Sequence, residues 1–240
     1  MDIKNKLIQL ACSVVPKAIK RRIITDSKEN SIEIFSQEGE DKLLERFVGE
    51  KKFGIYVDIG AHHPTFLNNT FFFYKKGWRG INIDATPGSM KPFEKLRPYD
   101  INIEQPIANQ TSELEFHIFS TPELNTFDKT NVAKFLNYPY VNLEKKIKLT
   151  TVKLENLLER NLPRLGNPQI DFFTIDVEGM DLDVLKSNNW NKFRPNYVLV
   201  EDLSVDIFNL ENNEIVNFMT SVGYTITAKT VNTLFFKKNA

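Results

Sequence analysis

Cysteine is almost absent from the sequence, since Cys12 is the only one among 240 residues. A single cysteine cannot form an internal disulfide, and scarce cysteine is typical of a reducing compartment. We therefore expect a cytoplasmic protein. An excess of charge is also missing, because 31 Lys and Arg residues balance 31 Asp and Glu residues. Nucleic-acid binders usually carry a basic excess or stripe, so we expect no nucleic-acid partner.

The sequence also lacks a long apolar run. The apolar residues between Ile3 and Val15 are interrupted by Lys4 and Lys6 and stop before Pro16. This run is shorter than the ~20 residues of a membrane span, and it has no signal-peptide cleavage pattern. We expect an amphipathic extension over residues 1–30. It either docks on the protein's own surface or on the second copy of a homodimer, or it makes a weak peripheral membrane contact through residues 1–22.

No Pro/Gly/Ser-rich linker or internal repeat divides the rest, which predicts one domain over residues 31–240. Short β-branched runs alternate with helical patterns along it. Strands are expected at 54–60, 80–84, 101–103, 113–119, 147–152, 170–176 and 197–201, and helices at 36–47, 64–76, 89–96, 154–161, 181–186 and 212–222. This alternation predicts an α/β fold with a doubly wound, mostly parallel sheet. Residues 225–230 and 233–237 predict a closing antiparallel hairpin, and residues 121–140 an inserted loop or lid.

Acidic residues end several of these strands: Asp58, Asp84, Asp176, and the pair Glu201 and Asp202. Ligands of open α/β sheets bind beyond the carboxyl ends of the strands. Gly60 permits a tight turn there, and Asp84 matches the carboxylate that holds ribose hydroxyls in nucleotide-binding folds. The full G-x-G-x-x-G turn for a dinucleotide is missing, since His62 stands at the second glycine. The pattern therefore favours a nucleoside without phosphate.

Several ordered motifs resemble the FkbM-type methyltransferases. The matching segments are S36-Q-E-G-E-D41, V57-D-I-G-A-H-H-P64, N68-N-T70, G77-W-R-G-I-N-I-D-A85, D171-F-F-T-I-D-V-E-G179 and R194-P-N-Y-V-L-V-E201. The resemblance implies a seven-stranded class I methyltransferase sheet with S-adenosylmethionine as the methyl donor. Members of that family often methylate hydroxyls of sugars, so the resemblance also implies a saccharide acceptor.

The resemblance further implies positions for the donor. Asp58 and Gly60 would hold its methionine end, and Asp84 its ribose hydroxyls. Ala61 and Ala85, the neighbours of Gly60 and Asp84, are also expected to bind the donor. Ala108 would lie at the adenine, and Gln37 and Gly39 would form part of a lid.

Removal of the acceptor's proton calls for a base, and His62, His63, Asp176 and Glu178 are the candidates. The alternative for the histidine pair is a solvated or backbone-bonded role. Asp176, Glu201 and Asp202 form a candidate Mg²⁺ site that resembles the metal site of macrocin-type sugar O-methyltransferases. The alternative is that Glu178 or Glu201 caps a helix and pairs with Arg194 or a lysine.

We therefore expect an S-adenosylmethionine-dependent O-methyltransferase that acts on a hydroxyl of a saccharide or glycosylated small molecule, such as a sugar of a surface polysaccharide. Two alternatives stay open. One is an oxidoreductase that binds NAD or a nucleotide-sugar, although the chain lacks a Tyr-x-x-x-Lys pair for it. The other is a catalytically inactive binding module.

Overall fold

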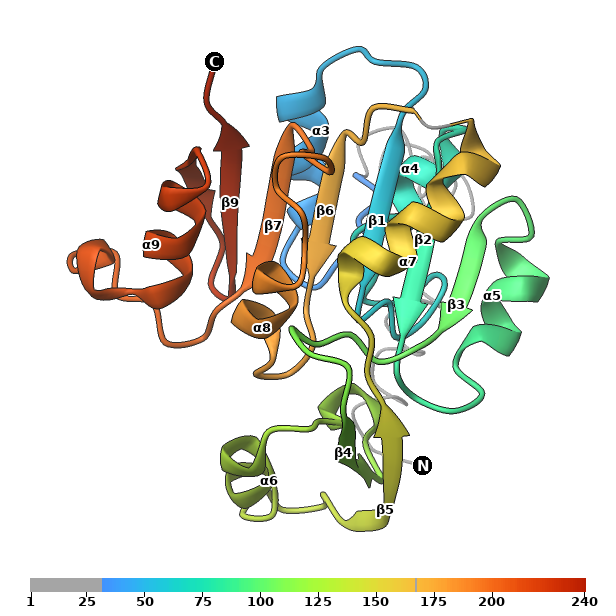
Figure 1. Cartoon of the computed structure of the whole chain (residues 1–240), viewed down its shortest axis with the longest axis vertical. Coiled ribbons are helices and arrows are strands. Elements are labelled where there is room, and N and C mark those ends of the chain that lie inside the picture. The colour runs from blue at the N-terminus through green and yellow to red at the C-terminus, as the bar shows by residue number, and fades with distance from the viewer. Residues whose placement is uncertain (1–31, 167) are drawn as a thin grey trace, which may run out of the picture. The chain divides into compact units, whose positions relative to one another are not determined.

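The computed structural model describes residues 32–166 and 168–240, and Phe35–Ala240 form one compact unit. Its centre is a seven-stranded sheet in the order β3-β2-β1-β6-β7-β9-β8 (Figure 1). β3, β2, β1, β6 and β7 pair in parallel, whereas β9 pairs antiparallel with both β7 and β8. The predicted α/β class with its C-terminal hairpin is thus confirmed. The strands are β1 (Ile55–Ile59), β2 (Arg79–Asp84), β3 (Ile101–Glu104), β6 (Phe172–Ile175), β7 (Tyr197–Glu201), β8 (Tyr224–Lys229) and β9 (Thr233–Lys238).

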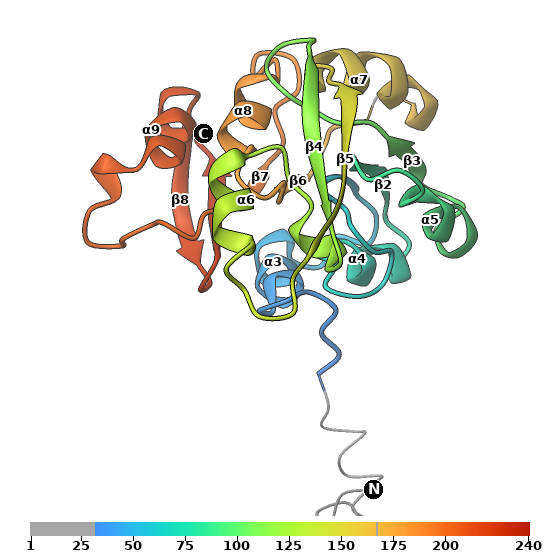
Figure 2. The same ribbon diagram turned by 90° about the horizontal axis from the view of Figure 1, so that it is seen from below.

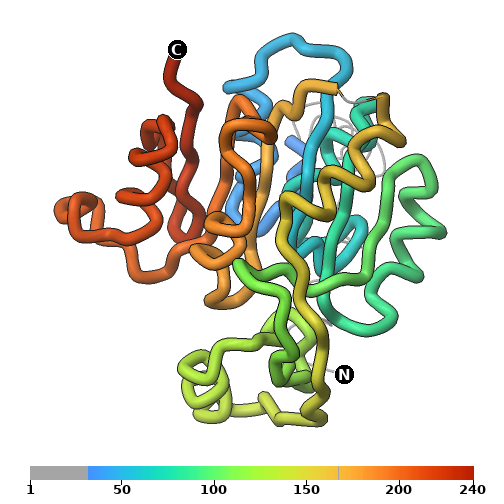
Figure 3. Tube along the Cα trace, viewed as in Figure 1, coloured from blue at the N-terminus to red at the C-terminus, as the bar shows by residue number. Residues whose placement is uncertain are grey.

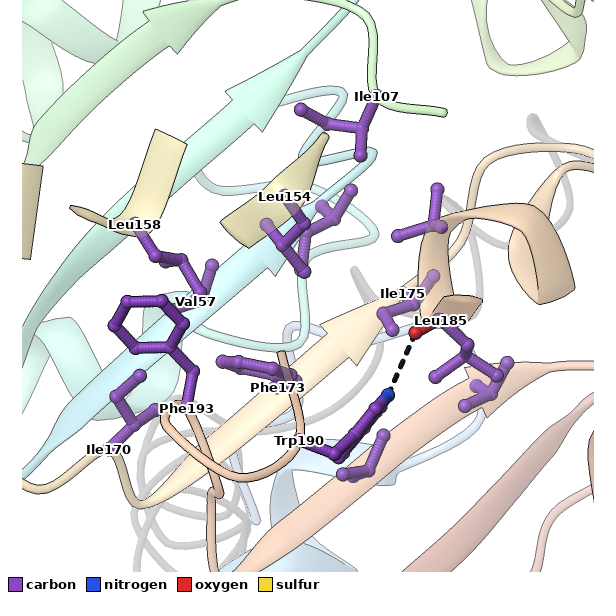
Figure 4. Packing of buried hydrophobic residues seen from close by; sticks show 14 of the residues in the cluster. Val57, Ile107, Leu154, Leu158, Ile170, Phe173, Ile175, Leu185, Trp190 and Phe193 are labelled. Atoms are coloured by element: carbon purple, nitrogen blue, oxygen red, sulfur yellow. Dashed lines mark hydrogen bonds between the residues drawn. The ribbon is translucent and has the colours of Figure 1, made fainter. Parts of the chain in front are cut away.

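Helices cover both faces of this sheet, because alternate strand residues are apolar on both sides. Val57 on β1 belongs to one core cluster together with Leu154 and Leu158, which is drawn in Figure 4. The indole nitrogen Nε1 of Trp190 there donates to the carbonyl of Leu185 at 2.8 Å. The helices are α3 (Glu40–Val48), α4 (Phe71–Lys75), α5 (Met90–Leu96), α7 (Leu154–Asn161), α8 (Asp181–Lys186) and α9 (Glu214–Ser221), with short 3₁₀ turns η2 (Leu162–Leu165) and η3 (Leu210–Asn212).

The opposite face has its own core cluster. Tyr56 of β1 and Phe172 of β6 pack there with Leu44 of α3, Phe73 of α4 and Trp78. Because the side chains of Tyr56 and Asp58 alternate with those of Val57 and Ile59, Asp58 points to this second face. That orientation decides which groups surround its carboxylate.

A separate two-stranded sheet stands at the carboxyl ends of the parallel strands (Figures 1 and 3). It pairs β4 (Glu113–Phe119) with β5 (Leu143–Thr150) in antiparallel register. Between them lie the 3₁₀ turn η1 (Pro122–Leu124) and helix α6 (Lys129–Phe135). Residues 113–150 are called the flap below, and Figure 2 shows it across the end of the main sheet.

Two local predictions were wrong. The expected helix over 64–76 begins only at Phe71, because the side chains of Asn68 and Thr70 bond to Asp58 and hold the preceding residues as a loop. The expected loop over 121–140 contains α6, which begins where the Asp128 carboxylate accepts from the amide of Thr130 at 2.9 Å. Side chains of Asp and Asn at such caps satisfy helix amides that would otherwise lack partners.

A buried guanidinium joins the loop after β1 to the sheet. Arg97 is fully buried, and its Nε donates to Asp100 at 2.9 Å. Its two terminal nitrogens donate to Asn68 (3.0 Å), Tyr56 (2.7 Å) and Thr70 (2.9 Å). All of its sides are bonded, as a charge in the interior requires.

We predict that Arg97→Met lowers the free energy of unfolding by about 3–5 kcal/mol, because it leaves the Asp100 carboxylate buried without its cation. Urea unfolding measures this. Arg79→Met is the matched control, since Arg79 is only partly buried and lies over the rings of Tyr74 and Tyr99. We expect it to cost about 1 kcal/mol or less. Equal losses in the two variants would contradict the role of the network.

Candidate active site

A cavity opens where β1, β2 and β6 end. The empty space between its walls is about 570 Å³, which includes open solvent. Gly60, Asp84 and Asp176 line it from the three strand ends, and Phe116 and Phe127 line it from the flap. This cavity is called the donor cavity below, because the methyl donor is expected from the sequence at these strand ends.

Gly60 allows the loops after β1 and β6 to touch. Its φ is +82°, and a Cβ there would lie 1.7 Å from the carbonyl oxygen of Asp176. Any other side chain would push the two loops apart. The amides of Gly60 and Ala61 both donate to the carbonyl of Ile83, at 2.9 and 3.0 Å, so the turn is also fixed to β2.

Asp84 lies in the donor cavity as predicted, and its carboxylate is oriented by backbone amides. The amide of His62 donates to one oxygen at 3.0 Å, and that of Thr86 to the other at 2.7 Å. Each carboxylate oxygen accepts more than one hydrogen bond. Asp84 therefore keeps acceptor capacity for a pair of hydroxyls in the cavity.

Asp58 lies elsewhere, outside the lining of the donor cavity. One of its oxygens accepts from Thr70 Oγ1 at 2.7 Å and from Asn68 Nδ2 at 3.1 Å. Burial raises the pKa of Asp58, while nearby Arg97 and the two hydrogen bonds oppose that rise. The structure thus places Asp58 as the anchor of the loop over 61–70, and a direct contact of its carboxylate with a ligand has no support in this geometry.

Of the five other predicted donor residues, two line the donor cavity or a hollow beside it and three line neither. Ala85 lines the donor cavity, whereas Gln37 lines a neighbouring hollow that also contains Gly60 and His62. Ala61 is buried against Met90 and Phe93. Gly39 precedes α3 with φ +87°, and the amide of Ala108 donates to Val152 at 3.0 Å. The neighbour Ile107, not Ala108, lines the cavity.

The flap also contributes side chains to the site, which was not predicted from the sequence. Phe116 and Phe127 lie with ring centroids 4.5 Å apart at the cavity wall. Two flap side chains, Thr126 Oγ1 and Asn131 Nδ2, donate to the carbonyl of Glu178 at 2.7 and 2.8 Å. Aromatic residues within an otherwise polar insertion were the signal that could have identified this contribution.

Three carboxylates meet beside the donor cavity. Asp176, Glu178 and Glu201 each offer an oxygen, and these oxygens all lie within 4.8 Å of one another. They are called the acid triad below. Glu178 occupies a left-handed backbone conformation with φ +53°, which costs of order 1–3 kcal/mol for such a residue.

Burial and mutual repulsion hold protons on the acid triad. Burial, followed by the charges of Asp176 and Asp181, raises the pKa of Glu178 to about 8. Burial and the charge of Glu178 raise the pKa of Glu201 to about 7. The pKa of Asp176 is raised well above its usual value by burial and by the charge of Glu201. Perturbed carboxyls in a cleft are typical of functional sites.

Asp202 is not a member of the triad, and Glu178 stands in the place predicted for it. One oxygen of Asp202 accepts from the amide and hydroxyl of Ser204, at 2.8 and 2.6 Å. The other accepts from Asn213 Nδ2 at 2.6 Å. These bonds cap the chain after β7. Arg194, the expected partner of Glu178 or Glu201, instead donates to the carbonyl of Val222 at 2.9 Å.

The two histidines point to different surroundings. His62 lines the donor cavity, with Nε2 at 3.5 Å from the Glu123 carboxylate. His63 Nδ1 accepts from the amides of Thr65 and Phe66 at 3.3 and 3.1 Å. Burial and the neighbouring His62 lower the pKa of His63. Of the pair, His62 is the one placed to meet a ligand.

The doubly wound sheet, with a cavity at the carboxyl ends of its strands, has the class I methyltransferase fold. The model of the FkbM methyltransferase domain family matches residues 58–226, more than half of the chain. The chain belongs to this family and is an S-adenosylmethionine-dependent methyltransferase.

Solved structures of two methyltransferases are among those that match this chain. A TehB-like SAM-dependent methyltransferase from Corynebacterium glutamicum shares 8% identity at a TM-score of 0.43, and the match covers 93% of this chain and 97% of that one. A methyltransferase from Geobacter sulfurreducens shares 12% identity at a TM-score of 0.41, and the match covers 100% and 98%. No curated protein matches the sequence significantly.

The raised carboxyl pKa values predict a pH-dependent stability. Between the unfolded value of 4.5 and the folded value of about 8, Glu178 binds more protons in the folded state. Its contribution to the free energy of unfolding therefore falls as the pH rises through this window. We expect the Tm of the cofactor-free protein to fall between pH 5 and 8, and Glu178→Gln to make this fall shallower.

Thermal unfolding at several pH values measures this effect. Glu144→Gln, an equal charge change at an exposed position on β5, should leave the slope as in the wild type. A slope unaltered by Glu178→Gln would show that Glu178 ionises as freely in the folded chain as in the unfolded one.

Proposed function

We propose that this enzyme methylates a hydroxyl of a saccharide, with the donor held in the donor cavity and the acid triad at the point of transfer. The observation that carries the proposal is the position of the triad. Glu178 lines both the donor cavity and a polar cleft on its other side, so it lies where a donor and an acceptor can meet. The donor supplies a methyl group activated by a positively charged sulfonium.

The residues around the donor cavity fit the parts of such a donor. Asp84 presents two oriented carboxylate oxygens, which suit the two hydroxyls of a ribose. Ile107, Phe116 and Phe127 offer an apolar wall for a flat base, since aromatic rings favour offset-stacked or edge-on contact. Asp176 lies at the third strand end, where the positive sulfonium of a bound donor would favour the ionised form of its carboxyl.

The acid triad supplies the base. A hydroxyl that receives a methyl group must lose its proton, and a carboxylate within hydrogen-bond reach can take it. Burial keeps Glu178 basic, with a pKa of about 8. His62 is the second candidate base in the same cavity, whereas the bonds that His63 accepts from its own loop favour a structural role for it.

A test of the donor site is Asp84→Ala. Loss of two hydrogen bonds to a charged acceptor, each worth about 1.5–3 kcal/mol, should weaken binding of S-adenosylhomocysteine by at least roughly 100-fold. Isothermal titration calorimetry measures this. The matched control is Glu104→Gln, at the end of the neighbouring strand β3, where Glu104 accepts from the amide of Gly88 at 2.6 Å outside the cavity lining. Unchanged affinity in Asp84→Ala would remove Asp84 from the donor site.

The acid triad also has the donor set of a Mg²⁺ site, as Mg²⁺ prefers carboxylate oxygens. A divalent ion there would offset the repulsion that raises the three pKa values. If Mg²⁺ acts in catalysis, EDTA should abolish methyl transfer to a saccharide and Mg²⁺ should restore it. Full activity after chelation would show that catalysis needs no metal and that the triad acts only as a base.

The sequence alone left two alternatives to a methyltransferase, an oxidoreductase and an inactive binding module. Membership of the methyltransferase family decides against an oxidoreductase. Binding of the donor without methyl transfer to any acceptor is the result that would instead identify an inactive binding module. Residues 1–30, where the sequence predicts an amphipathic extension that contacts a membrane or a second copy, lie outside the described residues. Within residues 32–166 and 168–240, no helix combines the length and apolarity needed to cross a bilayer.

A further inference from the structure

A polar cleft adjoins the donor cavity at Glu178. It encloses about 1790 Å³, including open solvent, between α6 of the flap and the segment after β7. A smaller hollow of about 890 Å³ joins the two, since it shares Gly60, His62 and Asp176 with the donor cavity and Lys134 and Glu201 with the polar cleft. A molecule in the cleft can therefore reach the transfer point.

The charge of this cleft is strongly one-sided. Among the described residues that line it, one is basic, Lys134, and seven are acidic: Asp128, Glu178, Asp181, Glu201, Asp202, Asp206 and Glu214. Four asparagines complete a hydrogen-bonding surface: Asn131, Asn209, Asn212 and Asn213. A cleft lined by one sign of charge concentrates ligands of the opposite sign and repels those of its own.

The joining hollow adds an apolar side to this polar surface. Leu67, Phe135, Tyr138 and Leu203 line it, and Tyr138 keeps 41% of its surface exposed. A flat ring beside hydrogen-bonding groups suits a sugar, which has a ring face of C–H groups and an edge of hydroxyls.

We propose that the polar cleft is the acceptor site and that it selects saccharides that carry an ammonium group and no phosphate or carboxylate. This inference rests on the proposed saccharide acceptor and narrows its class. The acid triad holds protons, but four other acids of the cleft, Asp128, Asp202, Asp206 and Glu214, still outnumber its single lysine. A nucleotide-sugar or sugar phosphate would bring its own negative charge beside them. An amino sugar would find the carboxylates as partners and the asparagines for its hydroxyls.

The test compares three tetrasaccharides of different charge on the enzyme saturated with S-adenosylhomocysteine. The probes are the tetramers of glucosamine, N-acetylglucosamine and galacturonic acid, at about pH 6, where the free amines are protonated. We expect the glucosamine tetramer to bind at least 10-fold more tightly than the galacturonate tetramer, with the N-acetylated tetramer between them. Added salt should narrow this spread, because it screens exposed charges.

Two charge changes on opposite sides of the cleft sharpen the test. Glu214→Lys, in the first turn of α9, should weaken binding of the glucosamine tetramer at least 3-fold, and Lys134→Glu should preserve or strengthen it. Glu94→Lys on α5 makes the same change as Glu214→Lys at an exposed position outside the cleft and should leave binding unaltered. Affinity for S-adenosylhomocysteine serves as the check that each variant is folded.

The outcomes separate the two proposals. Equal or tighter binding of the galacturonate tetramer, or loss of glucosamine-tetramer binding in Lys134→Glu, would overturn the charge selectivity. If none of the three tetramers binds at millimolar concentration while S-adenosylhomocysteine does, the acceptor inference fails and the donor site stands. If S-adenosylhomocysteine does not bind either, the proposed function fails as well.

Discussion

The site depends on one close backbone contact, between Gly60 after β1 and the carbonyl of Asp176 after β6. A Cβ at residue 60 would overlap that oxygen at 1.7 Å, so only glycine lets the neighbouring strand ends meet. The same turn brings the amide of His62 to Asp84. Three strand ends are therefore fixed relative to one another by backbone atoms. Carboxylates held in this way do not need to be reoriented when a ligand arrives, which is the advantage of a preorganised site.

The flap extends this arrangement beyond the main sheet. Its Thr126 and Asn131 both donate to the carbonyl of Glu178, a residue in a strained left-handed conformation. Such strain persists where surrounding bonds impose it. The flap therefore does two things at once: its aromatic pair forms a wall of the donor cavity, and its polar side chains hold the acid that faces the polar cleft. Movement of the flap would alter both sites together.

The sequence was informative where local chemistry decides the structure. Alternating β-branched runs predicted the sheet, and the acids at the strand ends predicted Asp84 and Asp176 at the ligand edge. It was misleading where tertiary bonds compete with local preference. Pro64 suggested a helix start, but Asn68 and Thr70 bond to Asp58 and Arg97 instead. Glu178 replaced Asp202 in the acid triad because Ser204 and Asn213 occupy the Asp202 carboxylate. Side-chain pairings of this kind leave no periodic signal, even where the partners are only 2 or 12 residues apart, as in Asp202–Ser204 and Asp58–Thr70.

The acid triad destabilises the fold, and the charge balance of the proposed reaction gives a reason for this arrangement. Three buried carboxyls that share a site repel one another and hold protons, so they destabilise the fold as the pH rises. Transfer of a methyl group from a sulfonium to a hydroxyl removes one positive charge and releases one proton. A carboxylate of the triad that takes this proton loses its negative charge in the same event. Before transfer, an ionised acid balances the positive charge of the donor. After transfer, the donor product is neutral and the acid is protonated. Burial would be unfavourable for a carboxylate that stays charged, but it suits a group whose charge changes during the reaction.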